Sequence, residues 1–145
     1  MAITTSVICN SFKKQLLEGT HNFSSGSGNS FKLALYTNSA TLGKSTTSFT
    51  TDNQVSNTGQ YTSGGGALTN GGTSLSTNTA IIDFADRSFT GVTLTARGAL
   101  IYNDTASGDP AVCVLDFGGD KSASSGTFTI QFPAFTSSAA ILRIT

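Results

Sequence analysis

Charge is the scarcest property of this 145-residue sequence. Only 11% of its residues are charged and the formal net charge is zero, whereas about a quarter of the residues in an average soluble domain carry charge. Binding to nucleic acid needs a basic stripe on the surface. The eight Lys and Arg residues are scattered, and only Lys13 and Lys14 are adjacent. We therefore expect no nucleic acid among the partners.

Side chains that carry out chemistry are also few. The sequence has one histidine, two cysteines and no tryptophan. A structural zinc site needs about four His or Cys ligands, and no G-x-S-x-G elbow accompanies the many serines. The single histidine, His21, lies in a polar connection, and we interpret it as a residue that orders this connection. We predict that the protein is not an enzyme and has no catalytic residues, cofactor or metal.

Two patterns are close to ligand-binding motifs but do not match them. Gly118-Gly119-Asp120-Lys121-Ser122 lacks the first glycine of a phosphate loop, and the Asp120 carboxylate would repel phosphate. We interpret this stretch as part of a hairpin loop over residues 118–126. The aspartates mostly flank predicted turns, where carboxylates accept backbone hydrogen bonds. A calcium site and a glycosidase carboxylate pair are the alternatives.

Long apolar runs are absent as well. No run approaches the roughly 18 residues of a membrane-spanning helix, and the N-terminus lacks the charged and apolar regions of a signal peptide. We expect no membrane partner and synthesis in the cytosol. Cys9 and Cys113 lie in apolar contexts, so we predict two free buried thiols. A disulfide is the alternative, and it requires their elements to touch.

Serine, threonine and glycine are abundant, with 20, 23 and 16 residues, and this composition favours strands and turns over helices. The one predicted helix spans residues 5–18. Ile8, Phe12 and Leu16 form an apolar stripe along it, Thr5 or Ser6 caps its start, and Gly19 is placed to end it.

Short apolar or alternating stretches between turn signals predict the strands. They are residues 31–37, 80–84, 92–96, 99–102, 111–117, 127–132 and 139–144, whereas residues 73–78 read as a turn. Gly98 separates two of these strands and predicts a bulge or a close backbone approach. We predict an all-β single domain over residues 1–145, a β-sandwich or jelly-roll-like fold over about residues 30–145 that follows the N-terminal amphipathic helix.

A long polar stretch, residues 38–59, connects the first predicted strand to Tyr61 and the Gly64-Gly65-Gly66 turn. Such long excursions are usually functional. Few of its residues are apolar, so we expect it to add little to the core and to be ordered by a partner or by a second copy of the chain. The candidate subunit contacts are Phe12, Leu16, Leu42, Phe49, Val55 and Tyr61. The alternative for Phe12 and Leu16 is the chain's own core.

Residues 8–23, 30–51 and 53–69 resemble segments of a group of tailed-bacteriophage virion proteins. The shared pattern is SFK-x-x-LL-x-G-x-H-x-F, then FK-x-ALYT, then a Thr-rich loop that closes in G-x-Y-x-x-GG-x-x-L. Here it falls on Ser11, Phe12, Lys13, Leu16, Leu17, Gly19, His21, Phe23, Phe31, Lys32, Ala34, Leu35, Tyr36, Thr37, Gly59, Tyr61, Gly64, Gly65 and Leu68. Members of this group are generally known as structural proteins of the particle.

The resemblance implies a non-enzymatic virion structural protein. Our leading hypothesis is a capsid decoration or cement protein on the head exterior, oligomeric, and bound to the major capsid protein or other virion proteins. It would reside in the host cytoplasm before assembly. The alternatives are a head-fibre, neck or tail component, and a carbohydrate-binding module for host recognition.

Overall fold

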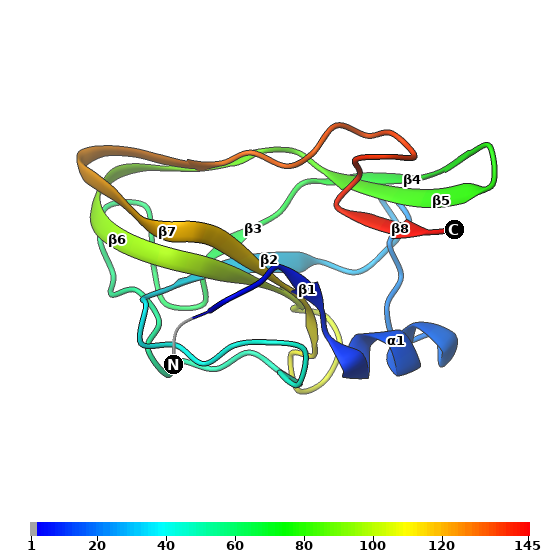
Figure 1. Ribbon diagram of the computed structural model, residues 1–145, viewed down its shortest axis with the longest axis horizontal. Coiled ribbons are helices and arrows are strands. Elements are labelled where there is room, and N and C mark those ends of the chain that lie inside the picture. The colour runs from blue at the N-terminus through cyan, green and yellow to red at the C-terminus, as the bar shows by residue number, and fades with distance from the viewer. Residues whose placement is uncertain (1–2) are drawn as a thin grey trace.

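The structure, a computed structural model, describes residues 3–145. Strands hold 48% of the residues and helix 6%, which confirms the all-β class. The elements are β1 (Val7–Ile8), α1 (Asn10–Leu17), β2 (Phe31–Tyr36), β3 (Gly66–Ala67), β4 (Asn70–Ser76), β5 (Thr79–Phe84), β6 (Arg87–Asn103), β7 (Ala111–Ile130) and β8 (Leu142–Ile144). Two antiparallel sheets face each other, one ordered β1-β7-β6-β2-β3 and the other β4-β5-β8 (Figure 1). This strand order does not by itself establish a jelly roll.

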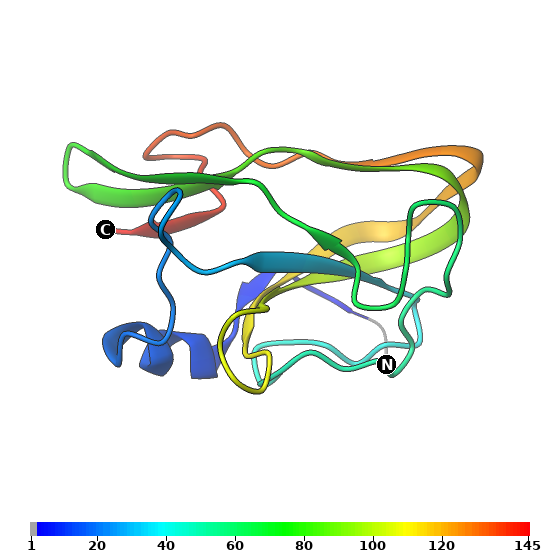
Figure 2. The same cartoon turned by 180° about the vertical axis from the view of Figure 1, so that it is seen from behind.

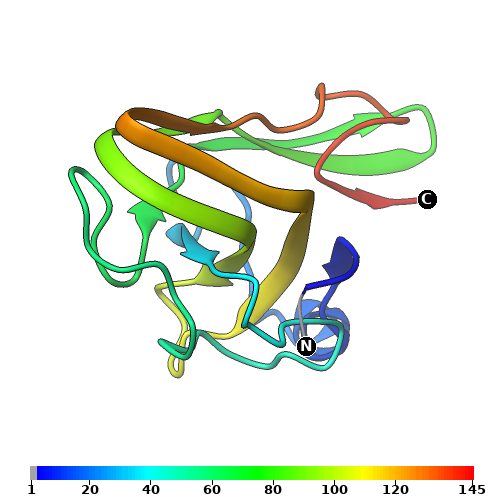
Figure 3. The ribbon, with the colours of Figure 1, turned by 60° about the vertical axis from the view of Figure 1, so that its left-hand side comes forward.

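β6 and β7 form a long hairpin that belongs to both layers. The pairing runs from Arg87 opposite Ile130 to Tyr102 opposite Ala111. The two strands lie side by side and bend together at one end of the molecule (Figure 3). The start of β6 and the end of β7 thereby reach the layer of β4, β5 and β8. One register shift falls between Ala96 and Gly98, which confirms the predicted bulge.

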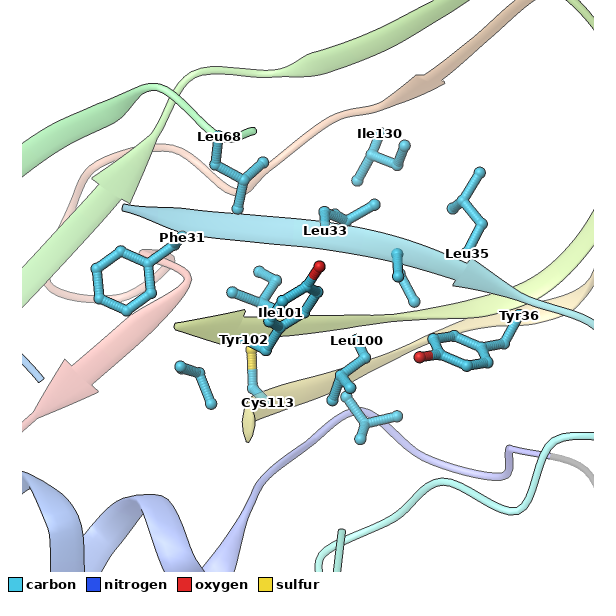
Figure 4. Close-up of a cluster of buried hydrophobic side chains, with 14 of the residues drawn as sticks. Phe31, Leu33, Leu35, Tyr36, Leu68, Leu100, Ile101, Tyr102, Cys113 and Ile130 are labelled. Atoms are coloured by element: carbon cyan, nitrogen blue, oxygen red, sulfur yellow. The ribbon is translucent and has the colours of Figure 1, made fainter. Parts of the chain in front are cut away.

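The centre of the core lies around β2, which is buried on both faces except for the partly exposed Lys32. Leu33 and Leu35 project to one side of the strand, and Tyr36 projects to the other (Figure 4). On the side of Tyr36, residues 38–52 run along the five-stranded sheet, on the face away from β4, β5 and β8 (Figure 2). Gln54 and Val55 then pair with the edge of β2. The polar stretch therefore forms a third layer over this sheet.

The helix is shorter than the predicted residues 5–18. Val7 and Ile8 instead pair with Val114 and Cys113 of β7 as an edge strand. Cys9 is the N-cap of α1 and forms no side-chain cap bond, and the Ser6 hydroxyl accepts a hydrogen bond from the Asp116 amide. Strand pairing with β7 satisfies backbone groups that a longer helix would have used. Gly19 follows the helix with φ +77°, as expected of a C-terminal glycine.

Two segments predicted as turns are strands. Residues 118–126, the predicted hairpin loop, lie within β7, where Ser122 pairs with Thr95 and their hydroxyl oxygens are 2.7 Å apart. Residues 73–76 lie within β4, paired to β5. In both cases a partner strand supplies the backbone hydrogen bonds, and this tertiary pairing overrides the weak intrinsic preference of Ser and Gly. The predicted last strand, residues 139–144, shrinks to β8.

Candidate functional site

The six predicted contact residues lie in or against the chain's own core. Phe12, Val55 and Tyr61 are buried, and Leu16, Leu42 and Phe49 are partly buried and pack against the core cluster. The structure therefore supports the alternative for Phe12, which is a place in the chain's own core, and supports it in part for Leu16. Because most of this apolar area already contacts the same chain, little of it is free to meet a second subunit.

Tyr61 is the clearest case. Its side chain is fully buried, and its hydroxyl oxygen accepts a hydrogen bond from the Leu35 amide at 2.8 Å. The same hydroxyl lies 3.0 Å from Oε1 of Gln54, and the ring packs edge-on against Phe89. Burial raises the pKa of Tyr61 to about 12, against the opposing effect of its backbone hydrogen bond to Leu35. The residue holds the end of the polar stretch against β2.

Ala40 and Val55 of the polar stretch belong to the core cluster, and Leu42 and Phe49 pack against it, so the expectation that the stretch adds little to the core is wrong. Hydrogen bonds fix the stretch at several further points. The Val55 amide donates to the Leu35 carbonyl at 2.9 Å, and the Phe49 amide donates to the Asp109 carbonyl at 3.0 Å. The Phe49 ring packs on Tyr102, whose centroid is 4.7 Å away. The Tyr36 hydroxyl donates to the Thr50 carbonyl at 2.7 Å. What this stretch offers to solvent is chiefly hydroxyl, amide and backbone groups.

His21 is a buried structural residue that joins α1 to the sheet. Its ring contacts Phe12 at a centroid distance of 4.8 Å. Oδ1 of Asn103 accepts from the Thr105 and Ala106 amides, so Nδ2 of Asn103 must face Nδ1 of His21, 3.1 Å away. This network assigns the proton to Nε2, which donates to Oε1 of Gln15 at 3.0 Å. Burial lowers the pKa of His21, consistent with a neutral ring.

The two cysteines are free and buried, as predicted. Burial raises the pKa of Cys9 to about 11; burial, and to a lesser degree the nearby Cys9, raise that of Cys113 to about 12. Both sulfurs therefore remain protonated thiols at neutral pH, the form that is not nucleophilic.

The aspartates are mostly engaged in turns and pairs. Oδ1 of Asp86 accepts from the Phe132 amide, Asp104 pairs with Lys32 at 3.4 Å, and Asp116 pairs with Arg97 at 3.2 Å. Within residues 3–145, no group of three or more His, Cys, Asp or Glu side chains could hold a metal ion. Over the same residues, no helix is long and apolar enough to cross a membrane.

An apolar groove opens between α1 and the three-stranded sheet of β4, β5 and β8. It has a volume of about 180 Å³. Its walls come from β1, α1, β4, β5, β8 and the connection after α1: Ile8, Phe12, Leu16, Phe23, Thr73, Ala80, Ile81, Ile82, Leu142, Arg143 and Ile144. Three large apolar side chains lie exposed on α1 and on the two edges of this sheet, namely Leu17 (91%), Leu75 (71%) and Ile144 (58%).

Two of the predicted contact residues, Phe12 and Leu16, line this groove, but sequence reasoning missed its walls on β1, β4, β5 and β8. Ile144 lies in a stretch that reads as a last core strand, and Ile8 lies in one that reads as a helix stripe. Edge position depends on strand order, and hydrophobic periodicity contains no information about strand order. No family model, curated protein or solved structure matches this chain.

Proposed function

We propose that this chain is a non-enzymatic structural protein of a tailed-bacteriophage particle, carried on the exterior of the head as a decoration or cement protein. The proposal starts from the sequence pattern that it shares with that group. The observation that supports it best is the use of the pattern's residues: they build the fold. Tyr61 bonds the backbone of β2, and His21 joins α1 to Asn103.

Two glycines of the pattern, Gly59 and Gly65, also build the fold. Gly65 has φ +81°, and a Cβ atom there would overlap the Leu33 carbonyl. Gly59 has φ +49°, and a Cβ atom there would overlap the backbone at Gly91. Close backbone approaches of this kind need glycine. A group of proteins defined by such positions shares an architecture, which suits a role as a building unit.

The surface chemistry supports a place outside the shell. A chain with zero net charge has no general attraction to packaged DNA. The exposed hydroxyl and amide groups of residues 38–59 can bond to a neighbouring subunit without burying charge. In the proposed mechanism many copies bridge adjacent shell subunits and share the load of internal DNA pressure. Because repeated contacts add through avidity, each contact can be modest.

The experiment compares particles made with and without this protein. We expect heads to assemble without it but to release their DNA at a lower temperature, and added purified protein to restore the release temperature. Cryo-electron microscopy of the restored particle then locates the chain. Its absence from purified wild-type particles would contradict the proposal. Unchanged thermal release combined with lost adsorption to cells would support the carbohydrate-binding alternative instead.

A further inference from the structure

The sheet of β4, β5 and β8 ends in an open edge beside the apolar groove. β8 pairs with β5 through Ala80 opposite Ile144 and Ile82 opposite Leu142. Within residues 3–145, no backbone hydrogen bond joins β8 to another strand on its opposite side. The outer edge of β8 therefore presents free N–H and C=O groups, which are a template for an added strand.

The groove runs along this same edge. Neighbouring residues on a strand point to opposite faces, yet Leu142, Arg143 and Ile144 all line the groove. A groove that touches three consecutive strand residues must border the strand's edge as well as its inner face. β8, α1 and β1 all contribute residues to the groove, and Figure 1 shows α1 below β8 with β1 next to α1. A strand added to β8 would project alternate side chains between β8 and α1.

The inner face shows which side chains the added strand needs. Leu142 and Ile144 share one face of β8 because they are two residues apart, and this is the inner face because Leu142 and its partner Ile82 belong to the core cluster. Leu142 is buried, but Ile144 is 58% exposed although it lines an apolar groove. Apolar side chains at alternate positions of an added strand would cover Ile144 and fill the groove beside Leu16.

Arg143 shows which strand is excluded. It points to the opposite face, and its Nη1 donates to the Ser137 carbonyl at 2.9 Å. If two copies paired through β8 about residue 143, two arginines would lie directly across from each other, and like charges in that position are destabilising. Ile81, its partner on β5, is uncharged. An acidic residue on the incoming strand would complement Arg143.

We propose that β8 accepts an extended segment of a different virion protein, which adds as a fourth strand with apolar residues at alternate positions and an acidic residue opposite Arg143. The identity of the partner as a virion protein rests on the proposed function. Main-chain pairing would supply the register and the groove would select the apolar side chains, as in other cases of strand addition.

The first test uses the full-length protein and a synthetic peptide with valine at alternate positions and aspartate between two of them. We expect the peptide to shift the amide resonances of β8 and to slow their hydrogen exchange, and a peptide of the same composition in scrambled order to do neither. Arg143→Glu should weaken binding by about fivefold, since a cross-strand charge pair contributes up to ~1 kcal/mol. Peptide contacts elsewhere, or none, would overturn the proposal.

The second test uses the particle and a matched pair of variants. Ile144→Lys places a charge at the groove, and Leu75→Lys places the same charge on the opposite edge of the same sheet, outside the groove. We expect Ile144→Lys to lose at least about tenfold in incorporation, and Leu75→Lys to incorporate like wild type. Both variants should melt within a few degrees of wild type, because both side chains are exposed.

The outcomes separate this proposal from the proposed function. If wild type is absent from the particle, the proposed function fails, whereas the peptide experiment still tests β8. If wild type incorporates and the two variants incorporate equally, the role of β8 is wrong and the proposed function stands. A concentration-dependent dimer of wild type that Ile144→Lys abolishes would show that the occupant is a second copy, contrary to the proposal.

Discussion

The two ends of this protein differ in how completely the chain covers itself. Over the five-stranded sheet, the long polar stretch of residues 38–59 lies against β2, and Tyr36 is fully buried with its hydroxyl bonded to the Thr50 carbonyl. At the other end, the three-stranded sheet leaves a groove beside α1 and exposes Ile144. The covering stretch is polar in sequence, whereas the groove is lined mostly by apolar side chains. Polarity of a segment therefore does not identify the surface that is left for a partner.

The contrast follows from where backbone hydrogen bonds are made. Residues 38–59 contain few apolar side chains, but their amides and carbonyls bond to β2 and to the 104–110 turn, as in Val55 to Leu35 and Phe49 to Asp109. β8 contains two large apolar side chains, yet only one of its edges is paired. We call these regions the covered end (residues 38–66 with β2) and the open end (α1 with β4, β5 and β8).

The sharpest test of the covered end is Gly65→Ala. The added Cβ would overlap the Leu33 carbonyl at a residue with φ +81°, and the backbone contact cannot relax without moving β2. We expect a loss of more than about 3 kcal/mol in the free energy of unfolding, measured by urea denaturation. Gly64→Ala is the control, since its φ is +95° but its Cβ would meet only the Tyr102 hydroxyl, at 3.5 Å.

Gly64→Ala should cost about 1–2 kcal/mol, the strain of a left-handed alanine alone. Equal losses for the two variants would mean that the close approach of residue 65 to β2 contributes nothing, and that the covered end is looser than the structure indicates.

Local sequence patterns predict some parts of the fold but do not predict the third layer. The strand at β2, the bulge at Gly98 and the turn before Pro110 follow from local patterns, because alternation and turn residues act over a few positions. The third layer does not follow, because its bonds join residues such as Ser48 and Pro110 across 62 positions. Residues 118–126 also read as a loop, since only their pairing with β6 makes them a strand.

The candidate surface was less predictable still. Apolar residues in a polar stretch, such as Val55, are equally suited to contact the chain itself or a partner, and the structure places Val55 in the core. Ile144 becomes notable only once β8 is known to be an edge strand. Edge position and groove geometry are properties of the assembled sheets and cannot be derived from the local pattern.

Tyr61→Phe tests one hydrogen bond of the covered end. The variant keeps the ring but leaves the buried Leu35 amide without the acceptor that lies 2.8 Å away. An unpaired buried amide costs about 1–3 kcal/mol, and we expect that loss in urea denaturation. Tyr36→Phe is the matched control, since it removes a partly buried bond to the Thr50 carbonyl and should cost about 1 kcal/mol or less. A larger loss for Tyr36→Phe than for Tyr61→Phe would mean that the bond to the Thr50 carbonyl holds the covered end more strongly than the bond to the Leu35 amide.

His21 joins α1 to β6, and its titration should make stability depend on pH. Burial lowers the pKa of His21 in the folded protein below the unfolded value of about 6.5. The unfolded chain then binds more protons, so this contribution is fully present above pH 6.5 and is lost as pH falls towards the folded pKa. One proton gives a slope of at most about 1.4 kcal/mol per pH unit.

The measurement is urea denaturation between pH 7.5 and 5. His21→Gln, which cannot titrate, should flatten the slope that wild type shows just below pH 6.5. The nearest polar groups to the ring are the uncharged Gln15 and Asn103, so no charged partner offsets the effect. A stability that rises as pH falls through this range would contradict the assigned tautomer and the packing around His21.

The smallest effect is expected for Leu17→Gln at the open end, and its value lies in the contrast with Leu16. Leu17 is 91% exposed, so its replacement removes almost no buried area and should change the free energy of unfolding by less than about 0.5 kcal/mol. Leu16, the preceding residue, packs against the core and lines the groove. Leu16→Gln should therefore cost more, about 1–2 kcal/mol. A substantial loss from Leu17→Gln in the isolated protein would mean that α1 already packs through Leu17 in solution, and that the open end is covered without a partner.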